Sequence, residues 1–283
     1  MFDNPAIHTN TVEMVCRELS VPAPAPYDAA LADADRLTRK LGALGGSDTA
    51  KRLTAAVFAS LIADTDPLAD DEVRRLVTLL MLQNNGIHPA AEKHRRELVG
   101  AAVVDNAELF VASWSSALAD DGRIMADTAK LATFANVDRL DAMHPSQLVD
   151  PDDHRAWIAA SRAARRLDNA AAGVVALLTA SHLRYPADHR VLVLAADLTS
   201  DRLAAVNRDA GQKADAWTLA RNGITPKLVG SLGEFVAAVG RIGAENAARR
   251  AEAEQQAERV GFGGSVGMTS DDLNRLTAVR LAR

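Results

Sequence analysis

Apolar residues recur at steps of three and four along most of this chain, and no other feature restricts its fold as strongly. The spacing places these side chains on one face of an α-helix. The first two stripes consist of Leu37, Leu41 and Leu44, and of Leu53, Val57 and Leu61. A Gly-Gly pair separates them, and Ser47 or Asp48 can cap the second helix. The sequence therefore predicts two helices that pack antiparallel across a tight turn.

The stretch 66–86, DPLADDEVRRLVTLLMLQNNG, predicts another helix. Carboxylates stand at its start, where they favour the positive end of a helix dipole, and Asn-Asn-Gly ends it. We interpret the acidic run from Asp64 to Glu72 as capping groups, because it lacks the glycine of a calcium loop and contains Pro67. Apolar residues spread beyond one face, so we expect the helix to be buried on most sides. These residues are Val73, Leu76, Val77, Leu79, Leu80, Met81 and Leu82.

Further helices are predicted over 89–104, 107–118, 122–134, 154–167 and 169–182. Hydrophobic residues make up 48% of the chain and aromatic residues only 4%, so alanine supplies much of the apolar share. Alanine has the highest helix propensity and favours closely packed helices. The predicted fold is all-α: a body of stacked antiparallel helix pairs, either an irregular α-solenoid or a helical bundle, with a long C-terminal helix and a hinged terminal helix.

One segment, HRVLVLA at 189–195, looks locally like a strand. A comparison within the chain argues for a helix instead. Residues 146–160 align without gaps to residues 181–195, and seven of the fifteen positions agree. The first copy continues into SRAARRLDNAA, which has a helical pattern. We therefore predict that the second copy is helical as well.

Weaker echoes of this pattern occur at ADDGRIMADTAKLA, with Asp121 and Arg123, and at ADDEVRRLVTLL, with Asp71 and Arg74. Each places an acidic pair at a helix start and an arginine in the first turn. In this respect the region of about 60–200 resembles HEAT-type repeats. The resemblance implies helix pairs that bury their faces by stacking on neighbouring pairs. The alternative is an irregular bundle in which the 35-residue echo is one old duplication or chance.

The two ends of the chain differ from its middle. Prolines alternate in VPAPAPY, so we expect residues 1–25 to form an extended arm ahead of an α-helical body at 26–230. Thr225 can cap, and Pro226 can open, a long helix that projects over 231–260, where charges and alanine replace the apolar stripe after Ile242. A glycine-rich hinge follows at 261–268. An amphipathic helix is predicted at 269–283, with Thr269 and Asp272 as a possible capping box.

Chemical motifs in the sequence have better structural explanations. Residues 263–267 spell G-x-S-x-G, but a hydrolase elbow needs a preceding strand, and no histidine follows Ser265. The seven histidines form no H-E-x-x-H motif, and Cys16, the single cysteine, is interpreted as a small packed hydrophobe. We assign the tryptophans, which could also line a groove, to the core. We therefore expect no catalytic residue, metal site or cofactor. The tryptophans are Trp114, Trp157 and Trp217.

The function predicted from these features is a non-enzymatic scaffold, adaptor or assembly factor that binds a protein partner. Its docking element would be the C-terminal helix, unless that helix folds back on its own body. The anchor residues would be Leu273, Leu276, Val279 and Leu281. A nucleic-acid-associated factor that uses arginine clusters on a helical surface is an alternative, disfavoured by the net charge of −5. A helical-bundle enzyme with a site not visible in the sequence is the other alternative.

The sequence also predicts the compartment. The start of the chain has no basic segment followed by an apolar run, and one cysteine cannot form an intramolecular disulfide. The longest apolar runs, LVTLLML and AAAGVVALL, are far shorter than the roughly 20 residues of a membrane helix. We therefore expect a cytoplasmic protein with no membrane partner. The arginine pairs at 95–96, 165–166 and 249–250 are interpreted as solvated faces balanced by nearby acids.

Overall fold

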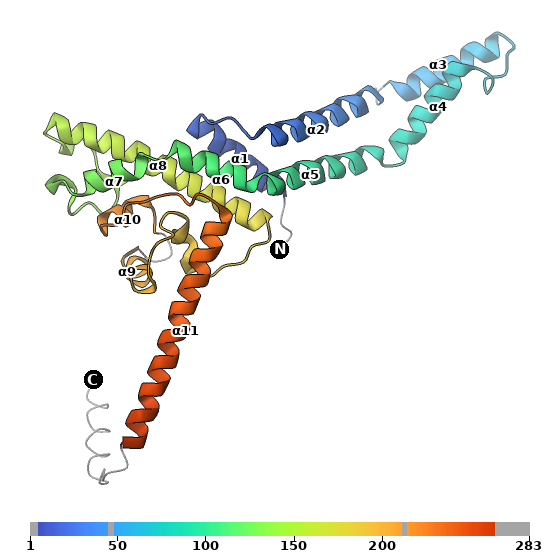
Figure 1. Ribbon diagram of the computed structural model, residues 1–283. Helices are drawn as coiled ribbons and strands as arrows, with labels where there is room; N and C mark the ends of the chain where they lie inside the picture. The colour runs from blue at the N-terminus through green and yellow to red at the C-terminus, as the bar shows by residue number, and fades with distance from the viewer. Residues whose placement is uncertain (1–4, 45–47, 211–213, 264–283) are drawn as a thin grey trace, which may run out of the picture.

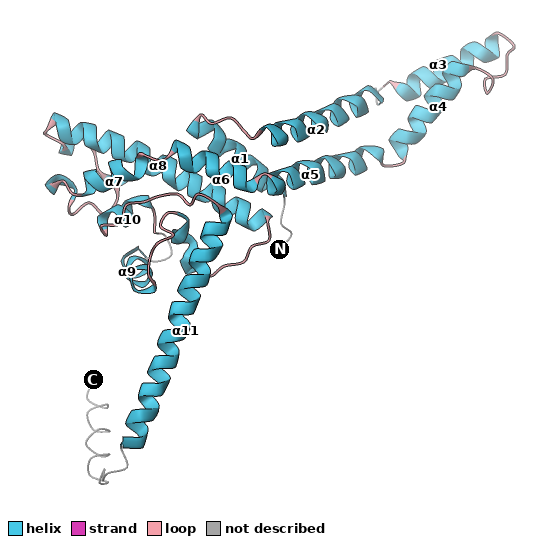
Figure 2. Cartoon of the chain, viewed as in Figure 1, coloured by secondary structure: helices cyan, strands magenta, loops and turns pink. Residues whose placement is uncertain are grey.

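The computed structural model describes residues 5–44, 48–210 and 214–263. Over these residues the chain consists of helices and connecting loops and contains no strand, which confirms the all-α prediction (Figure 2). The α-helices are α1 (Pro5–Leu19), α2 (Ala25–Leu44), α3 (Thr49–Ile62), α4 (Asp71–Asn84), α5 (Ile87–Asp105), α6 (Ala107–Ala117), α7 (Asp121–Ala129), α8 (Pro151–Ala180), α9 (Ser200–Ala210), α10 (Ala216–Arg221) and α11 (Leu232–Gly263). The 3-10 helices are η1 (Ala132–Phe134), η2 (Leu140–Ala142), η3 (Pro145–Gln147) and η4 (Ala187–Val193).

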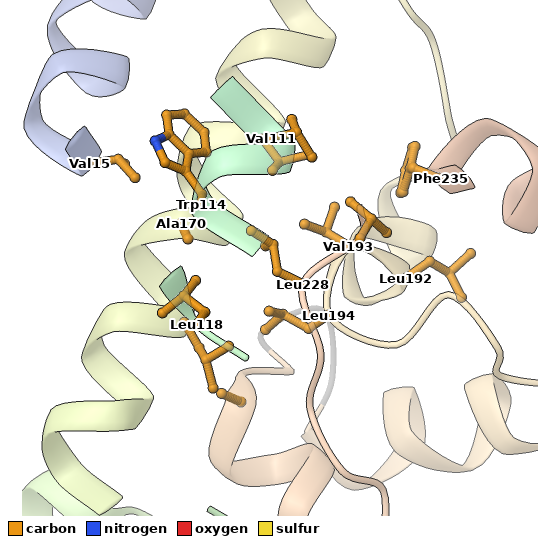
Figure 3. Packing of buried hydrophobic residues seen from close by; sticks show 14 of the residues in the cluster. Val15, Val111, Trp114, Leu118, Ala170, Leu192, Val193, Leu194, Leu228 and Phe235 are labelled. Atoms are coloured by element: carbon orange, nitrogen blue, oxygen red, sulfur yellow. The ribbon is translucent and has the colours of Figure 1, made fainter. Parts of the chain in front are cut away.

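The helix α8 is the centre of the body. It joins the two helices predicted at 154–167 and 169–182 into one, and buried residues occur along it from Ala160 to Leu178. Helices α1 and α7 pack along it. At Gly173 the approach is so close that an added Cβ would lie 2.8 Å from Cζ3 of Trp114 and 2.9 Å from Cγ2 of Val15. The small residues of α8 therefore let α1 and α6 reach its backbone (Figure 3).

The prediction of an extended arm at the N-terminus is wrong over residues 5–19, because α1 occupies them. Its apolar positions Val12, Val15 and Leu19 follow helical spacing and are buried in the core. Only the short connection after Leu19, which contains Pro22 and Pro24, is non-helical. The prolines limit where α2 begins, but the burial of α1 against α8 determines the structure of the segment before them.

The strand-like segment 189–195 adopts 3-10 turns in η4, so the predicted helix forms, although not as an α-helix. Its carbonyl groups accept backbone hydrogen bonds from residues far along the chain. Lys227 N donates to Leu194 O at 2.7 Å, and Val229 N donates to Val193 O at 2.9 Å. These bonds hold residues 224–231 in an irregular extended path, so the prediction of a helix opening at Pro226 is wrong. Helix α11 begins at Leu232 instead.

Two elongated features leave the body in different directions (Figure 1). One is α11, whose Phe235, Ala238 and Ile242 are buried beside the body and whose later residues are mostly exposed. The other is an arm of four helices, in which α2 lies beside α5 and α3 lies beside α4. Helix α3 continues outward from the end of α2, so the predicted antiparallel packing of these two helices is wrong. The arm pairs its helices in a nested order, unlike the successive pairs that HEAT-type repeats stack.

Candidate functional site

The outer end of the arm exposes a group of large apolar side chains. Helix α3 contributes three of them at positions i, i+3 and i+4, which share one face of a helix. The loop from α3 to α4 contributes the fourth. They are Phe58 (60% exposed), Leu61 (57%), Ile62 (87%) and Leu68 (74%). We call these four residues the apolar tip.

The apolar tip is an unusual concentration of exposed apolar surface. In the part of the chain that the structure describes, eight large apolar side chains are at least half exposed, and four of them lie within these eleven residues. Single exposed apolar residues are ordinary on a protein surface, whereas a contiguous group is typical of an interaction site. Leu61 was predicted to pack with Leu53 and Val57, but only the latter two are partly buried.

Polar contacts hold the loop behind the apolar tip in a defined shape. Asp70 caps α4, because its Oδ1 accepts hydrogen bonds from Glu72 N at 2.8 Å and Val73 N at 3.3 Å. Ser60, which is buried in α3, donates its hydroxyl to Asp70 Oδ2 at 2.8 Å. This hydrogen bond, followed by those from the two backbone amides, lowers the pKa of Asp70. The capping role predicted for the acidic run is thus confirmed at Asp70, which also links α3 to α4.

The apolar tip has an acidic border. Residues 58–75 contain five carboxylates and two arginines, a formal net charge of −3. Glu72 is neutralised, since it accepts from Arg52 of α3 and from Arg75 of α4, each at 2.8 Å. Asp64 and Asp66, in the loop between the two helices, form no ion pair with any described residue. The surface next to Ile62 and Leu68 therefore carries uncompensated negative charge.

Helix α4 is not buried on most sides, so that prediction is wrong. Only Val73 and Leu76 are buried, while Val77 and Met81 are exposed. In an arm of paired helices each helix can cover one face of its neighbour, and the other faces remain in solvent. The wide apolar pattern of α4 was the sequence signal for this exposed surface, but the sequence does not indicate which face of α4 no other helix covers.

The predicted C-terminal docking residues lie outside the described residues, so their role stays a prediction. They are Leu273, Leu276, Val279 and Leu281. Of the predicted hinge, residues 261–263 belong to the end of α11, and the rest, including Ser265, is likewise outside. Cys16 is buried and accepts a hydrogen bond from Trp114 Nε1 at 3.4 Å. Burial raises the pKa of this thiol, which agrees with a packed residue rather than a nucleophile.

The arginine pairs are largely compensated by acids, as the sequence suggested. Arg95 lies 3.5 Å from Asp35, Arg165 lies 3.2 Å from Glu18, and Arg166 binds the buried Asp121 at 3.0 Å. On α11, Arg249 lies 2.6 Å from Asp201. A surface that captures phosphates needs cations that are free to neutralise them. Four of these six arginines are paired with an acid, while Arg96 and Arg250 form no ion pair with a described residue.

Comparisons with known proteins add no relative. No protein-family model matches the chain, and neither the curated proteins nor the solved structures contain a match. Across the described helices, no segment has the length and hydropathy that a membrane crossing requires. The same residues contain no group of three or more histidine, cysteine or acidic side chains placed to hold a metal ion.

Proposed function

We propose that this protein is a non-enzymatic interaction scaffold, an adaptor or assembly factor, that binds another protein through the apolar tip of its arm. The observation that carries the proposal is the group Phe58, Leu61, Ile62 and Leu68, exposed at the end of an arm that extends from the body. A surface at this position is accessible to a large partner. The chain has one cysteine, which is typical of proteins in a reducing compartment, so the proposed setting for this role is cytoplasmic.

Four side chains are enough for a binding hot spot but too few for a whole protein–protein interface. Full burial of one large apolar side chain contributes roughly 1.5–3 kcal/mol. Association costs roughly 4–15 kcal/mol before any contact is counted. Four such residues therefore need support from surrounding polar contacts. The acidic loop with Asp64 and Asp66 supplies charges for such a border.

These charges also define the partner. An acidic border favours a partner surface on which lysine or arginine side chains surround an apolar groove. A second copy of this chain is disfavoured, because two apolar tips in contact would bring their net charges of −3 together. The proposed occupant is therefore a different protein with a basic-bordered apolar groove. Its binding should weaken with added salt, while the apolar contribution persists.

Site-specific photo-cross-linking in the cells that express the protein tests this proposal. A photoreactive residue replaces Ile62 in one full-length variant and Val149 in another. Val149 is 95% exposed on a loop of the body, so it is a matched apolar position outside the arm. We expect one defined cross-linked protein from position 62 and none of that mass from position 149. The same product from both positions, or from position 149 alone, would contradict docking at the apolar tip.

The C-terminal helix is tested in the same assay. A chain that ends at Val260 lacks Leu273, Leu276, Val279 and Leu281 but retains the arm. Docking by the apolar tip predicts that the cross-link from position 62 persists in this shortened chain. Its loss would assign the binding to the C-terminal segment.

A further inference from the structure

The body contains a cavity of about 1010 Å³ that is lined by charged and aromatic residues. Helix α8 forms one wall, and α10 together with the segment around η2 forms the others. The cavity is built from residues that are distant in the sequence, between Asp138 and Arg221. None of these residues belongs to the surface proposed for the protein partner.

Two tryptophans line this cavity and are fixed in place by the protein. Trp157 Nε1 donates to Leu140 O at 3.1 Å, and Trp217 Nε1 donates to Val137 O at 2.8 Å. Trp157 also stacks on His154, with ring centroids 6.0 Å apart. Because both indole N–H groups already have partners, each tryptophan offers the cavity ring surface only. Such rings attract cations through their electron-rich faces.

Each arginine of the cavity wall forms an ion pair with a carboxylate. Arg139 lies 2.6 Å from Asp141, and Arg221 lies 2.8 Å from Asp138. Arg165 reaches out of the cavity to Glu18 on α1. The cavity wall contains five aspartates and three arginines, a formal charge of −2. Because Arg165 is paired with Glu18 of α1, three carboxylates of the wall remain, and one of them, Asp209, lies 3.9 Å from Arg221.

The other two are Asp168 of α8 and Asp215 at the start of α10. Asp168 Oδ1 accepts a hydrogen bond from Ala216 N at 3.0 Å, and Asp215 Oδ1 accepts from Thr218 N at 2.8 Å. Within the described residues, neither has a cationic side chain within 4.0 Å. A second hollow of about 330 Å³ adjoins the same two carboxylates. Ser161, one helical turn from Trp157, adds a buried hydroxyl with no hydrogen-bond partner there.

We propose that this cavity binds a small organic ammonium ion, whose charged group is held between Asp168 and Asp215 and whose carbon chain lies in the space lined by the rings of Trp157 and Trp217. The ammonium group donates hydrogen bonds to the carboxylate oxygens of Asp168 and Asp215, and its carbon chain extends along the cavity towards Ser161 and Trp157, which precede Asp168 on α8. A charged carboxylate that is removed from water without a counter-charge is costly, and the bound cation supplies the missing charge. The inference concerns the body and is independent of the partner bound by the arm.

The ionisation of Asp168 predicts how the affinity for the ammonium ion depends on pH. Burial, reinforced by the nearby charge of Asp215, raises the pKa of Asp168 to about 7, although Ala216 N and Arg190 oppose the shift. The other charged groups that line the two hollows with it are Arg165 on α8, Asp188 on η4, Asp209 on α9, Arg221 on α10, and Asp138, Arg139 and Asp141 around η2. Binding of a cation favours the ionised carboxylate, so it expels a proton. Affinity should therefore fall up to about tenfold per pH unit below about pH 7.

The test is calorimetric titration of the full-length protein with 1,4-diaminobutane. The matched probe is 1,4-butanediol, which has the same length and no charge, and Mg²⁺ is the inorganic comparison. We expect the diamine to bind and to release a proton near pH 7. The diol and Mg²⁺ should give no heat of binding. Binding of the diol as tightly as the diamine, a stronger response to Mg²⁺, or no binding of the diamine overturns the proposal.

Two substitutions locate the site. Asp168→Asn keeps the acceptor for Ala216 N but removes the charge, so diamine binding should weaken roughly tenfold or more and lose its dependence on pH around 7. Trp157→Leu should weaken it through loss of the ring. Asp197→Asn, at an exposed carboxylate that does not line the cavity, should leave it unchanged. Circular dichroism establishes that each variant folds, and unchanged binding by folded Asp168→Asn would refute the assignment.

Discussion

Replacement of Asp168 by asparagine should make the body more stable at alkaline pH, although it removes a buried hydrogen-bonding carboxylate. In the folded protein, burial raises the pKa of Asp168 from its ordinary value of 3.8 to about 7. The unfolded chain therefore releases this proton at lower pH than the folded protein does. The contribution of Asp168 to the free energy of unfolding is highest below about pH 4 and falls as pH rises to about 7. Above about pH 7 it stays constant.

The size of this effect follows from the shift. About three pKa units correspond to about 4 kcal/mol. Asparagine has no proton to release and still accepts from Ala216 N, so Asp168→Asn avoids the loss. We expect the variant to match the wild type at about pH 4 and to exceed its free energy of unfolding by about 2–4 kcal/mol at about pH 8.

Urea unfolding monitored by tryptophan fluorescence measures this difference across the pH range. All three tryptophans, Trp114, Trp157 and Trp217, lie in the body, so the signal reports body unfolding rather than changes in the arm. Asp197→Asn serves as the control for removal of an exposed charge. A difference between Asp168→Asn and wild type that does not change with pH, or a variant less stable at about pH 8, would refute the reasoning.

Three further predictions concern packing, the arm and the thiol. Gly173→Ala should lower the free energy of unfolding by about 1–3 kcal/mol, because the added methyl group overpacks the contact with Trp114 and Val15. Gly240→Ala, which has open space around it in α11, should raise the free energy of unfolding by up to about 1 kcal/mol in the same urea titrations. Equal effects of the two substitutions would contradict the close approach of Trp114 and Val15 to Gly173. Because Ser60 lowers the pKa of Asp70, the cap stabilises the arm above about pH 4 and is lost as pH falls through the lowered pKa. The protection of arm amides from hydrogen exchange, corrected for the intrinsic exchange rate at each pH, should therefore decrease at lower pH, and Asp70→Asn should remove this response. Cys16 should react with a thiol reagent only after unfolding, because burial raises its pKa; rapid labelling of the native protein would show that it is accessible.

The sequence predicted most helices, because apolar spacing is a local property. The helix predicted at 107–118 corresponds to α6, and the one at 89–104 corresponds to α5. The same spacing also runs through Val12, Val15 and Leu19, whereas the prolines that follow predict an extended backbone. Local propensity was also insufficient at Pro226, where backbone hydrogen bonds to η4 override a pattern suited to a helix start.

Helix pairing was not predictable in the same way. The sequence between α2 and α3 permits either direction for α3, and the choice depends on α5 and α4, which come later in the chain. The apolar tip arises from that choice, because α3 then meets α4 alone and exposes Phe58, Leu61 and Ile62. An apolar helix face looks the same in a sequence whether a neighbour covers it or not.

The cavity was invisible in the sequence for a related reason. Asp168 appeared to separate two helices, yet it lies inside α8, where it faces α10. Asp215 and Trp217 come almost fifty residues later. Trp114 and Trp217 are buried as predicted, while Trp157 is partly exposed and, with Trp217, lines the cavity. Only the packing of α8 with α10 and the segment before η2 brings these groups together.

The most direct test of the central claim is the affinity of the purified partner, identified by the cross-link from position 62, for matched full-length variants. Ile62→Ser and Val149→Ser each remove one highly exposed apolar side chain, from the apolar tip and from the body respectively. Docking through the apolar tip predicts that Ile62→Ser weakens binding roughly tenfold or more, as loss of about 1.5–3 kcal/mol of apolar burial requires, while Val149→Ser binds like the wild type. Equal affinities for all three proteins would contradict the account.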